Sequence, residues 1–394
     1  MKLAAWPYYD ADEIEAATAT LRSGAVNYHT GQECKQFEGE FAEYHGVGHA
    51  IALANGTLAL ELALRVLELE AGDEVIVTPR SYFASASAIS IVGATPVFVD
   101  VDPDSQNIDP AAVEAAVTDR TRAILVVHLA GWPADMPRLM TIADKHGLDI
   151  IEDCAQAHGA NIDGKPVGSF GRLAAFSFCQ DKIMTTGGEG GMLITDDEAL
   201  YKAAWSFKDH GKSLDRLGEP PERPGFRWLH ESIGSNYRMT EFQAAIGRLQ
   251  LSKLRNWVNR RNANTARLVA RLSDHPAMRI PRPPGNVLHA CYKFYTFVRP
   301  ETLAAGWDRD RVIAALSDAG APGWSGSCPE IYREVAYQSL DQPVLPVARE
   351  LGETSLMLPV HLTLTVEDMD RLADIVIATL DAATGETSAA AAGS

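Results

Sequence analysis

The sequence of 394 residues has no apolar run long enough to span a membrane, and its first residues lack the apolar core of a signal peptide. It is also poor in cysteine. The five cysteines, at positions 34, 154, 179, 291 and 328, are odd in number and show no CxxC spacing. That pattern is typical of a reducing compartment and argues against a structural zinc site. We therefore expect a cytoplasmic protein that holds no metal.

The sequence also contains fewer basic than acidic residues. Lys and Arg total 35 against 52 Asp and Glu, which gives a formal net charge of -17. This balance argues against non-specific binding of nucleic acid, which needs a basic surface. Small anionic ligands are not excluded, because local groups can override the overall field. Hydrophobic residues make up 46% of the chain, an ordinary globular content with an ample core.

From about residue 48, short apolar runs alternate with segments of helical periodicity. Such alternation predicts an α/β fold around a mostly parallel sheet. The expected strands cover 49–54, 74–78, 96–100, 122–127, 148–152, 173–178 and 190–195. The expected helices between them cover 57–69, 83–92, 110–117 and 135–146.

The length exceeds that of a usual single domain, so we expect two. A large domain covers residues 1–250, and a long helix over 240–272 leads into a smaller C-terminal α+β domain over 251–381. That domain is expected to hold strands near 292–299 and 355–360 and helices near 308–319 and 366–381. Residues 382–394, rich in Ala, Gly, Ser and Thr, are expected to form a disordered tail.

Lys182 is the most informative residue of the chain. It follows the apolar run 176–178 and precedes the glycine-dense turn 187–191. A lysine at the end of a buried strand can lose its hydration, point into a pocket and act as an amine nucleophile, as Schiff-base chemistry requires. A lone lysine before a turn is more often a surface residue, so the interpretation depends on features elsewhere.

Two of these features follow other strands. Gly56 and Thr57 lie at a strand–turn–helix junction, where Thr57 is a natural N-cap and the helix N-terminus can receive a phosphate. Asp153 ends a buried-looking strand at the edge where parallel sheets bind ligands, and a carboxylate there can keep a pyridine nitrogen protonated. The neighbouring Glu152 is expected to end the strand in solvent.

Two further segments are weaker. Phe83 or Tyr82, at the start of the next helix, could stack on a flat ring, although either would more often belong to a core. Asn236 and Arg238 precede the long helix, whose start fits a capping box formed by Thr240 and Gln243. Together the phosphate cradle, the acid, the aromatic residue and the lysine describe a site for pyridoxal 5'-phosphate (PLP).

With these features, the sequence resembles a known family, the fold-type-I PLP-dependent sugar aminotransferases of the DegT/StrS type. The resemblance covers nearly the whole chain. It is carried by the segments 55–57, 72–79, 93–98, 152–159, 177–191, 236–240 and 358–361.

The resemblance implies a role for each matching residue. Lys182 would form the Schiff base with the cofactor and move the proton, Asp153 would pair with the pyridine nitrogen, and Gln156 would contact the phenolic oxygen. The amides of Gly56 and Thr57, with the Ser177 hydroxyl, would hold the phosphate. Phe83 would stack on the ring. Asn236 would reach the cofactor of a neighbouring subunit, which implies a homodimer with shared active sites.

The family also implies a reaction. We expect transfer of an amino group from an amino acid donor, L-glutamate first, to a keto-sugar that carries a nucleotide, in polysaccharide or natural-product biosynthesis; the cofactor would alternate between PLP and its pyridoxamine form (PMP). The alternatives are an L-glutamine-dependent cyclitol aminotransferase and a PLP-dependent sugar dehydratase. Members of the dehydratase branch carry histidine in place of the lysine, so Lys182 favours transamination. Possible substrate contacts, which the sequence does not rank, are Lys208, His210, Lys212, Arg238 and Tyr332.

Overall fold

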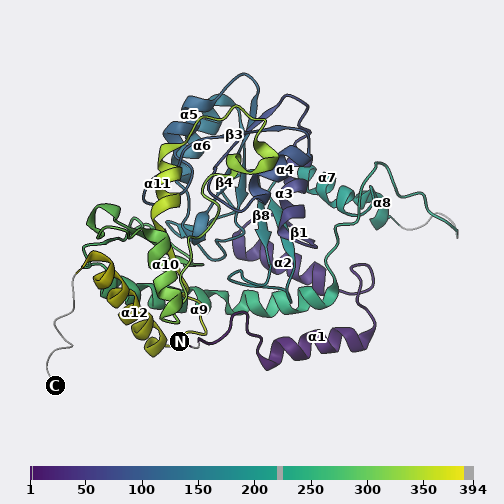
Figure 1. Ribbon diagram of the computed structural model, residues 1–394. Coiled ribbons are helices and arrows are strands. Elements are labelled where there is room, and N and C mark those ends of the chain that lie inside the picture. The colour runs from purple at the N-terminus through teal and green to yellow at the C-terminus, as the bar shows by residue number, and fades with distance from the viewer. Residues whose placement is uncertain (2, 220–224, 386–394) are drawn as a thin grey trace.

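A seven-stranded sheet forms the centre of the larger part of the molecule in the computed structural model, which describes residues 1, 3–219 and 225–385 (Figure 1). Its order is β1-β9-β8-β5-β4-β2-β3, and β9 runs antiparallel to both of its neighbours. The remaining pairs are parallel, which confirms the expected mostly parallel sheet. The strands are β1 (His49–Leu53), β2 (Glu74–Val77), β3 (Thr95–Phe98), β4 (Thr121–Val127), β5 (Asp149–Asp153), β8 (Leu173–Ser177) and β9 (Gly191–Thr195).

Both faces of this sheet are covered by helices. Successive side chains of a strand point to opposite faces, so one strand can contribute to two separate cores. In β2, Val75 and Val77 join a core on one face, while Ile76 joins a separate core on the other. The first core includes residues of α2 (Glu33–His45), α3 (Gly56–Arg65), α4 (Ala84–Ile91) and α7 (Glu198–Lys208). The second is covered by α5 (Pro110–Ala116) and α6 (Met136–His146).

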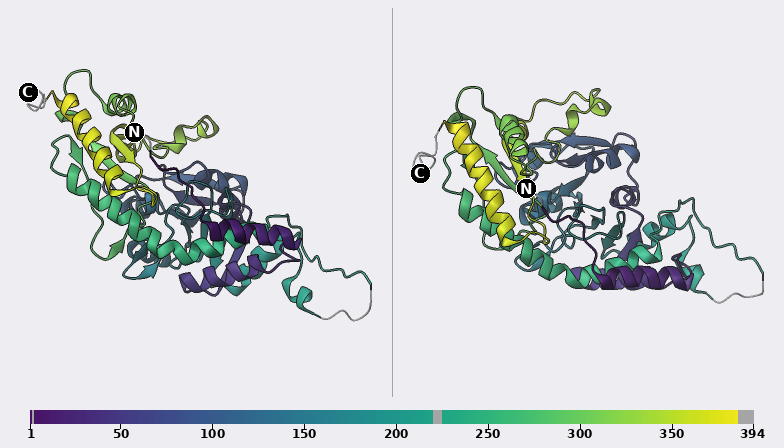
Figure 2. Two further views of the ribbon diagram at one scale, coloured as in Figure 1. Left: turned by 90° about the horizontal axis from the view of Figure 1, so that it is seen from below. Right: turned by 60° about the horizontal axis from the view of Figure 1, so that its bottom comes forward.

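Two helices precede the sheet and were not expected from the sequence. α1 (Ala11–Ser23) and α2 both pack against the long helix α9 (Glu241–Leu272), as Figure 2 shows for α1. The start of α9 has the predicted capping box, with Thr240 as N-cap and Gln243 at the third position. The helices α1 and α2 therefore pack on α9, and α2 and α9 contribute side chains to the first core.

A second, smaller sheet of order β10-β12-β13 contains β10 (Met278–Arg279), β12 (Phe294–Val298) and β13 (Ser355–Leu358). It has its own core with the C-terminal end of α9, α10 (Arg309–Asp318) and α12 (Val366–Thr384). Since α9 contributes to both cores, we propose that the domain boundary lies within this helix, near residue 250. α12 continues three residues into the expected tail, and residues 386–394 lie outside the described part of the chain.

The remaining elements are short. β11 (Val287–Leu288), β6 (Asn161–Ile162) and β7 (Lys165–Pro166) form a third small sheet. α11 (Pro346–Thr354) packs on β12, and α8 (Leu214–Gly218) packs against α7. In the described part of the chain, 3-10 turns cover Leu129–Gly131, Pro300–Thr302, Ile331–Arg333 and Val335–Tyr337. Among the helices described, none is long and apolar enough to cross a bilayer.

Candidate active site

A cavity of about 540 Å³ lies where β5 and β8 end and α3 begins. This is the edge at which open α/β sheets bind ligands. Six of the eight residues predicted for the site line it, namely Gly56, Thr57, Asp153, Gln156, Ser177 and Lys182. Phe83 and Asn236 do not. A larger groove of about 990 Å³ between α1, α2 and α9 contains none of the eight.

The N-terminus of α3 faces this cavity, but Thr57 is not its N-cap. The helix begins at Gly56, and the side chain of the extended Asn55 accepts a hydrogen bond from Leu58 N at 2.9 Å. Thr57 therefore lies in the first turn, where the backbone N–H groups of a helix remain unpaired. A Cβ at Gly56 would come within 2.5 Å of the Ser177 Cβ, so only glycine lets α3 approach β8 this closely.

Asp153 is 5% exposed at the end of β5. One carboxylate oxygen accepts a hydrogen bond from Ser85 Oγ at 2.8 Å, and the other accepts one from Ala155 N at 3.1 Å. Burial raises the pKa of this carboxyl, although the Ser85 hydrogen bond and the charge of Lys182 act against that shift. A cationic group bound at Asp153 would relieve the cost of burying its charge.

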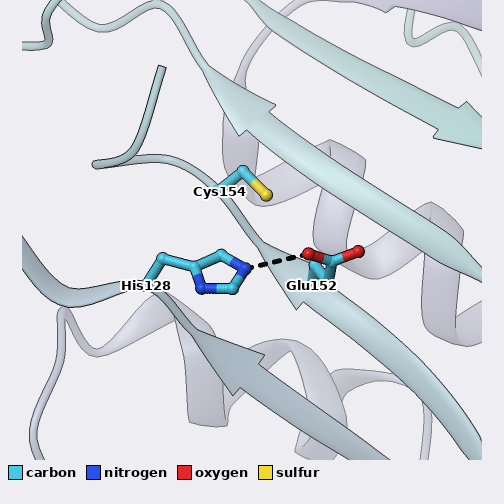
Figure 3. A group of neighbouring side chains, drawn as sticks. All are labelled: His128, Glu152 and Cys154. Carbon is cyan, nitrogen blue, oxygen red and sulfur yellow. Dashed lines mark hydrogen bonds and ion pairs between the residues drawn. The ribbon is translucent and has the colours of Figure 1, made fainter. Parts of the chain in front are cut away.

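Glu152 does not end its strand in solvent, as the sequence had indicated, but is fully buried on the opposite face of the sheet (Figure 3). One oxygen accepts hydrogen bonds from Phe170 N and Gly171 N, and the other accepts them from Gly168 N and His128 Nε2. Burial alone would raise the pKa of Glu152, but these donors hold it below its ordinary value. The backbone of the 168–171 loop is what makes burial of this acid possible.

The side chains of His128, Glu152 and Cys154 lie close together (Figure 3), and the atoms that could bind a metal are within 4.8 Å of one another. The ring of His128 is nevertheless engaged on both sides. Its Nδ1 accepts a hydrogen bond from Ala134 N at 3.0 Å, so Nε2 carries the proton that is donated to Glu152. Burial also raises the pKa of the Cys154 thiol well above its usual value. The cluster is a hydrogen-bonded structural group whose imidazole has no free lone pair for a metal.

The side chain of Lys182 is 14% exposed and faces the cavity. Its Nζ lies 3.9 Å from Asp181 Oδ1 and 5.2 Å from the centre of the Tyr292 ring. The hydroxyl of Tyr292 donates to Asp181, and the indole of Trp6 donates to the carbonyl oxygen of Lys182 at 2.9 Å. The backbone of Lys182 is thus held by Trp6 of the N-terminal segment, and Tyr292, which precedes β12, lies beside its side chain.

Gln156 is 7% exposed, and its Oε1 accepts a hydrogen bond from Ala130 N at 2.8 Å. A backbone N–H can only donate, so the carbonyl end of the Gln156 amide must face Ala130. The amide nitrogen is then left for the cavity. Sequence reasoning could not find Ala130, because its contribution is a backbone group.

The aromatic residue on the cavity wall is Tyr82 rather than the predicted Phe83. The Phe83 ring packs against Tyr337, with 5.6 Å between ring centres, at the edge of the first core. Tyr82 is 70% exposed in the described chain. The two neighbours face different surroundings, since Tyr82 lines the cavity, whereas Phe83, the N-cap residue of α4, packs against the first core.

Asn236 is exposed in the loop before α9 and pairs through its backbone with Asp209. The residues considered as substrate contacts also lie away from the cavity. Lys208 is fully buried with its Nζ 3.6 Å from Glu38, and both Lys212 and Arg238 form ion pairs with Asp209 at 2.8 Å. Among the described residues that line the cavity, Lys182 is the only one with a basic side chain.

Comparisons with known proteins agree with this geometry. Residues 7–377 match the model of the DegT/DnrJ/EryC1/StrS aminotransferase family. The chain is 36% identical, over 94% of each sequence, to a UDP-N-acetyl-3-dehydro-alpha-D-glucosamine 3-aminotransferase of Acidithiobacillus ferrooxidans. It is 39% identical, over 79% of this chain and 74% of the relative, to an L-glutamine:2-deoxy-scyllo-inosose aminotransferase of Streptomyces kanamyceticus.

A solved structure is similar over almost the whole chain. The aminotransferase from Psychrobacter cryohalolentis superposes with a TM-score of 0.94 at 48% identity, covering 97% of this chain and 100% of that one. The protein therefore belongs to the DegT/DnrJ/EryC1/StrS aminotransferase family and is an aminotransferase of the α/β, fold-type-I class.

Proposed function

We propose that this aminotransferase uses PLP, held in the cavity at the N-terminus of α3, to transfer an amino group from an amino acid to a keto-sugar. The observation that carries the proposal is that Lys182, Asp153 and the first turn of α3 line one cavity. The close approach of Gly56 to Ser177 leaves room for a phosphate against the free N–H groups of the helix. The residues present therefore fit this cofactor.

When bound, PLP supplies an electron sink for the carbon that loses or gains the proton. Lys182 provides the amine that attaches it and afterwards moves that proton at Nζ. The Asp153 carboxylate would hold a proton on the ring nitrogen, and the amide nitrogen of Gln156 would donate to the phenolic oxygen. From the placement of the two aromatics, we assign ring stacking to Tyr82 in place of Phe83.

We infer that a second chain completes the phosphate site. This site has helix N–H groups and the Ser177 hydroxyl, but a dianion favours additional donors or positive charge. The exposed Asn236 lies outside the cavity of its own chain, in accord with a role at the cavity of a second copy. We therefore propose a homodimer in which each cavity receives Asn236 from the other chain.

The substrate proposal draws on the relatives. One of them acts on a UDP-linked keto-sugar, and this supports a nucleotide-linked ketone as acceptor. L-glutamate is the proposed donor. The second relative uses L-glutamine with a cyclitol ketone, and that pair is the alternative to be tested. The five cysteines are all free thiols, so we place the reaction in the reducing cytoplasm.

Absorption spectroscopy tests the donor and the acceptor in turn. Protein loaded with PLP is mixed with L-glutamate or, separately, with L-glutamine, and the visible band is followed as the cofactor converts to its amine form. We expect conversion with L-glutamate and its reversal by a nucleotide-linked keto-sugar. Conversion by L-glutamine alone, reversed by an inosose, would instead establish the cyclitol reaction. A band that neither donor changes would contradict the proposed half-reaction.

Mixing two inactive variants tests the shared site. Lys182→Ala and Asn236→Ala each impair every cavity of a homodimer. In a mixed dimer, a cavity built from one Asn236→Ala chain receives the intact Asn236 of its Lys182→Ala partner, so one cavity in two is complete. We expect mixing to restore activity toward half of the wild-type level per mixed dimer. No recovery in dimers shown to have exchanged chains would contradict sharing.

A further inference from the structure

The turn that follows β4 supplies the backbone N–H that donates a hydrogen bond to the side chain of Gln156. Ala130 has a left-handed backbone, with φ of 56°, and its N–H faces Gln156 Oε1. This conformation is unfavourable for alanine, so the surrounding contacts have to hold it.

His128 connects both ends of the turn to the neighbouring strand. Its Nδ1 accepts from Ala134 N, at the far end of the turn over residues 128–134, and its Nε2 donates to Glu152 at 2.9 Å. Glu152 immediately precedes Asp153 and is paired in register with Val126 of β4. All of these side chains are buried, and Figure 3 shows His128 and Glu152 directed toward one another between the two strands.

The backbone adds a direct link to the second cofactor contact. His128 N donates to Asp153 O at 3.2 Å, so the residue that braces the turn also pairs with the strand end carrying the predicted acid. The four donors on Glu152 leave it no freedom to rotate. The His128–Glu152 pair is thus connected to Asp153 through the backbone and to Gln156 through the turn.

We propose that His128 and Glu152 are positioning residues, which hold the 128–134 turn so that Ala130 N–H presents the amide nitrogen of Gln156 to the cofactor ring. The inference rests on the proposed PLP site. Neither residue lines the cavity, so the pair would act only through Gln156 and the end of β5. This role is separate from the attachment of the cofactor at Lys182.

A second side chain, Asn107, also holds this turn and provides an independent variant. Asn107 Oδ1 accepts from Leu129 N at 2.8 Å, and Asn107 Nδ2 donates to Trp132 O at 2.9 Å. Asn107→Ala would therefore loosen the same turn without touching Glu152. This matters because His128→Gln keeps a donor for Glu152 but removes the acceptor of Ala134 N, and a buried N–H without an acceptor destabilises the fold.

The test is a double-mutant cycle on the dissociation constant of PLP, measured by titration of the cofactor-free protein. We expect His128→Gln to raise this constant about fivefold, the value of one lost buried hydrogen bond. Gln156→Ala alone should raise it by a similar factor. In the Gln156→Ala background, His128→Gln should add less than twofold, because the residue it positions is gone. Asn107→Ala replaces His128→Gln in the cycle if the latter does not fold.

The control is His45→Gln, which alters another buried histidine whose Nδ1 bonds only within its own helix, to Phe41 O. It should lower the melting temperature of the cofactor-free protein without coupling to Gln156. If His128→Gln raises the dissociation constant of PLP by the same factor in the wild-type and the Gln156→Ala backgrounds, the positioning role is overturned. The proposal that the protein binds PLP would then still stand. Absence of PLP binding by the wild-type protein would instead overturn the proposed function, and with it this inference.

Discussion

The indole nitrogen of Trp6 donates a hydrogen bond to the carbonyl oxygen of Lys182, 176 residues further along the chain, at 2.9 Å. The Trp6 ring is itself fixed by edge contact with Trp257, at 5.6 Å between ring centres, and by the Arg261 guanidinium, 5.3 Å from the ring centre. The N-terminal segment thus helps to orient the backbone from which the reactive amine projects.

Trp6→Phe should therefore impair the reaction more than it impairs the fold. The phenyl ring keeps most of the packing, but the Lys182 carbonyl loses its donor, a change of about 1 kcal/mol. We expect kcat to fall about fivefold with a small change in melting temperature. Trp307→Phe, at a tryptophan that packs under Arg311 in the smaller domain, is the control. Equal kcat values for the two variants would exclude a positioning role for Trp6.

Gly56→Ala should disrupt the phosphate cradle. The new methyl group would meet the Ser177 Cβ at 2.5 Å, so α3 must move away from β8. We expect the dissociation constant of PLP, measured by titration, to rise at least about tenfold, a loss of about 1.4 kcal/mol.

Gly39→Ala is the matched control for that change. Gly39 lies on the exposed face of α2, and a Cβ there meets nothing within 4 Å. Alanine should stabilise the helix by about 0.5–1 kcal/mol and leave PLP affinity unchanged. Unaltered affinity in Gly56→Ala would remove α3 from the cofactor site.

Tyr82 and Phe83 should respond differently to truncation. Tyr82→Ala removes an exposed ring from the cavity wall, so we expect weaker PLP binding with little loss of stability. Phe83→Ala removes a ring packed against Tyr337, so we expect a lower melting temperature and nearly unchanged affinity. Titration and thermal unfolding of both variants separate the two roles. The reverse pattern would restore Phe83 as the stacking residue.

The protein should lose stability in mild acid because of His158. Burial lowers the pKa of this imidazole to about 3, and both of its nitrogens lack a hydrogen-bond partner in the described structure. The unfolded chain takes up a proton near pH 6.5, whereas the folded chain does not. Stability is therefore complete above about pH 6.5 and falls as the pH decreases toward 3.

His158→Phe should reduce this acid sensitivity, since the ring already packs between Phe176 and Phe178. The wild-type free energy of unfolding should fall by a few kcal/mol between about pH 6.5 and pH 4, and the variant should lose less. Denaturant titrations at both pH values give the comparison. Substitution of the exposed His230 by Gln should leave the pH dependence unchanged. Identical slopes for His158→Phe and wild type would contradict the assignment.

Much of the large domain was predictable from local pattern. The central strands are apolar on both faces, so runs such as 122–127 were evident without tertiary information. Lys182 and Asp153 were predicted because each lies at or shortly after the end of such a run, and both line the cavity. The helices α1 and α2 were missed: the buried residues of α1 are the polar Glu13 and Thr20, and both helices pack against the distant α9.

The errors within the site have a common physical cause. Glu152 is buried because backbone donors of the 168–171 loop converge on it, and no side-chain pattern records those donors. Thr57 was preferred as N-cap although Asn55 caps equally well, and the position of the first helical turn decided between them. The Ala130 contact depends on a left-handed backbone that the sequence does not reveal.

The central claim is that Lys182 attaches the cofactor. The most direct measurement is reduction of the PLP-loaded protein with sodium borohydride, followed by proteolysis and mass spectrometry of the modified peptide. We predict one stably attached pyridoxyl group per chain, located on Lys182, and none in Lys182→Ala. A pyridoxyl group on another lysine, or none in a protein that binds PLP, would contradict it.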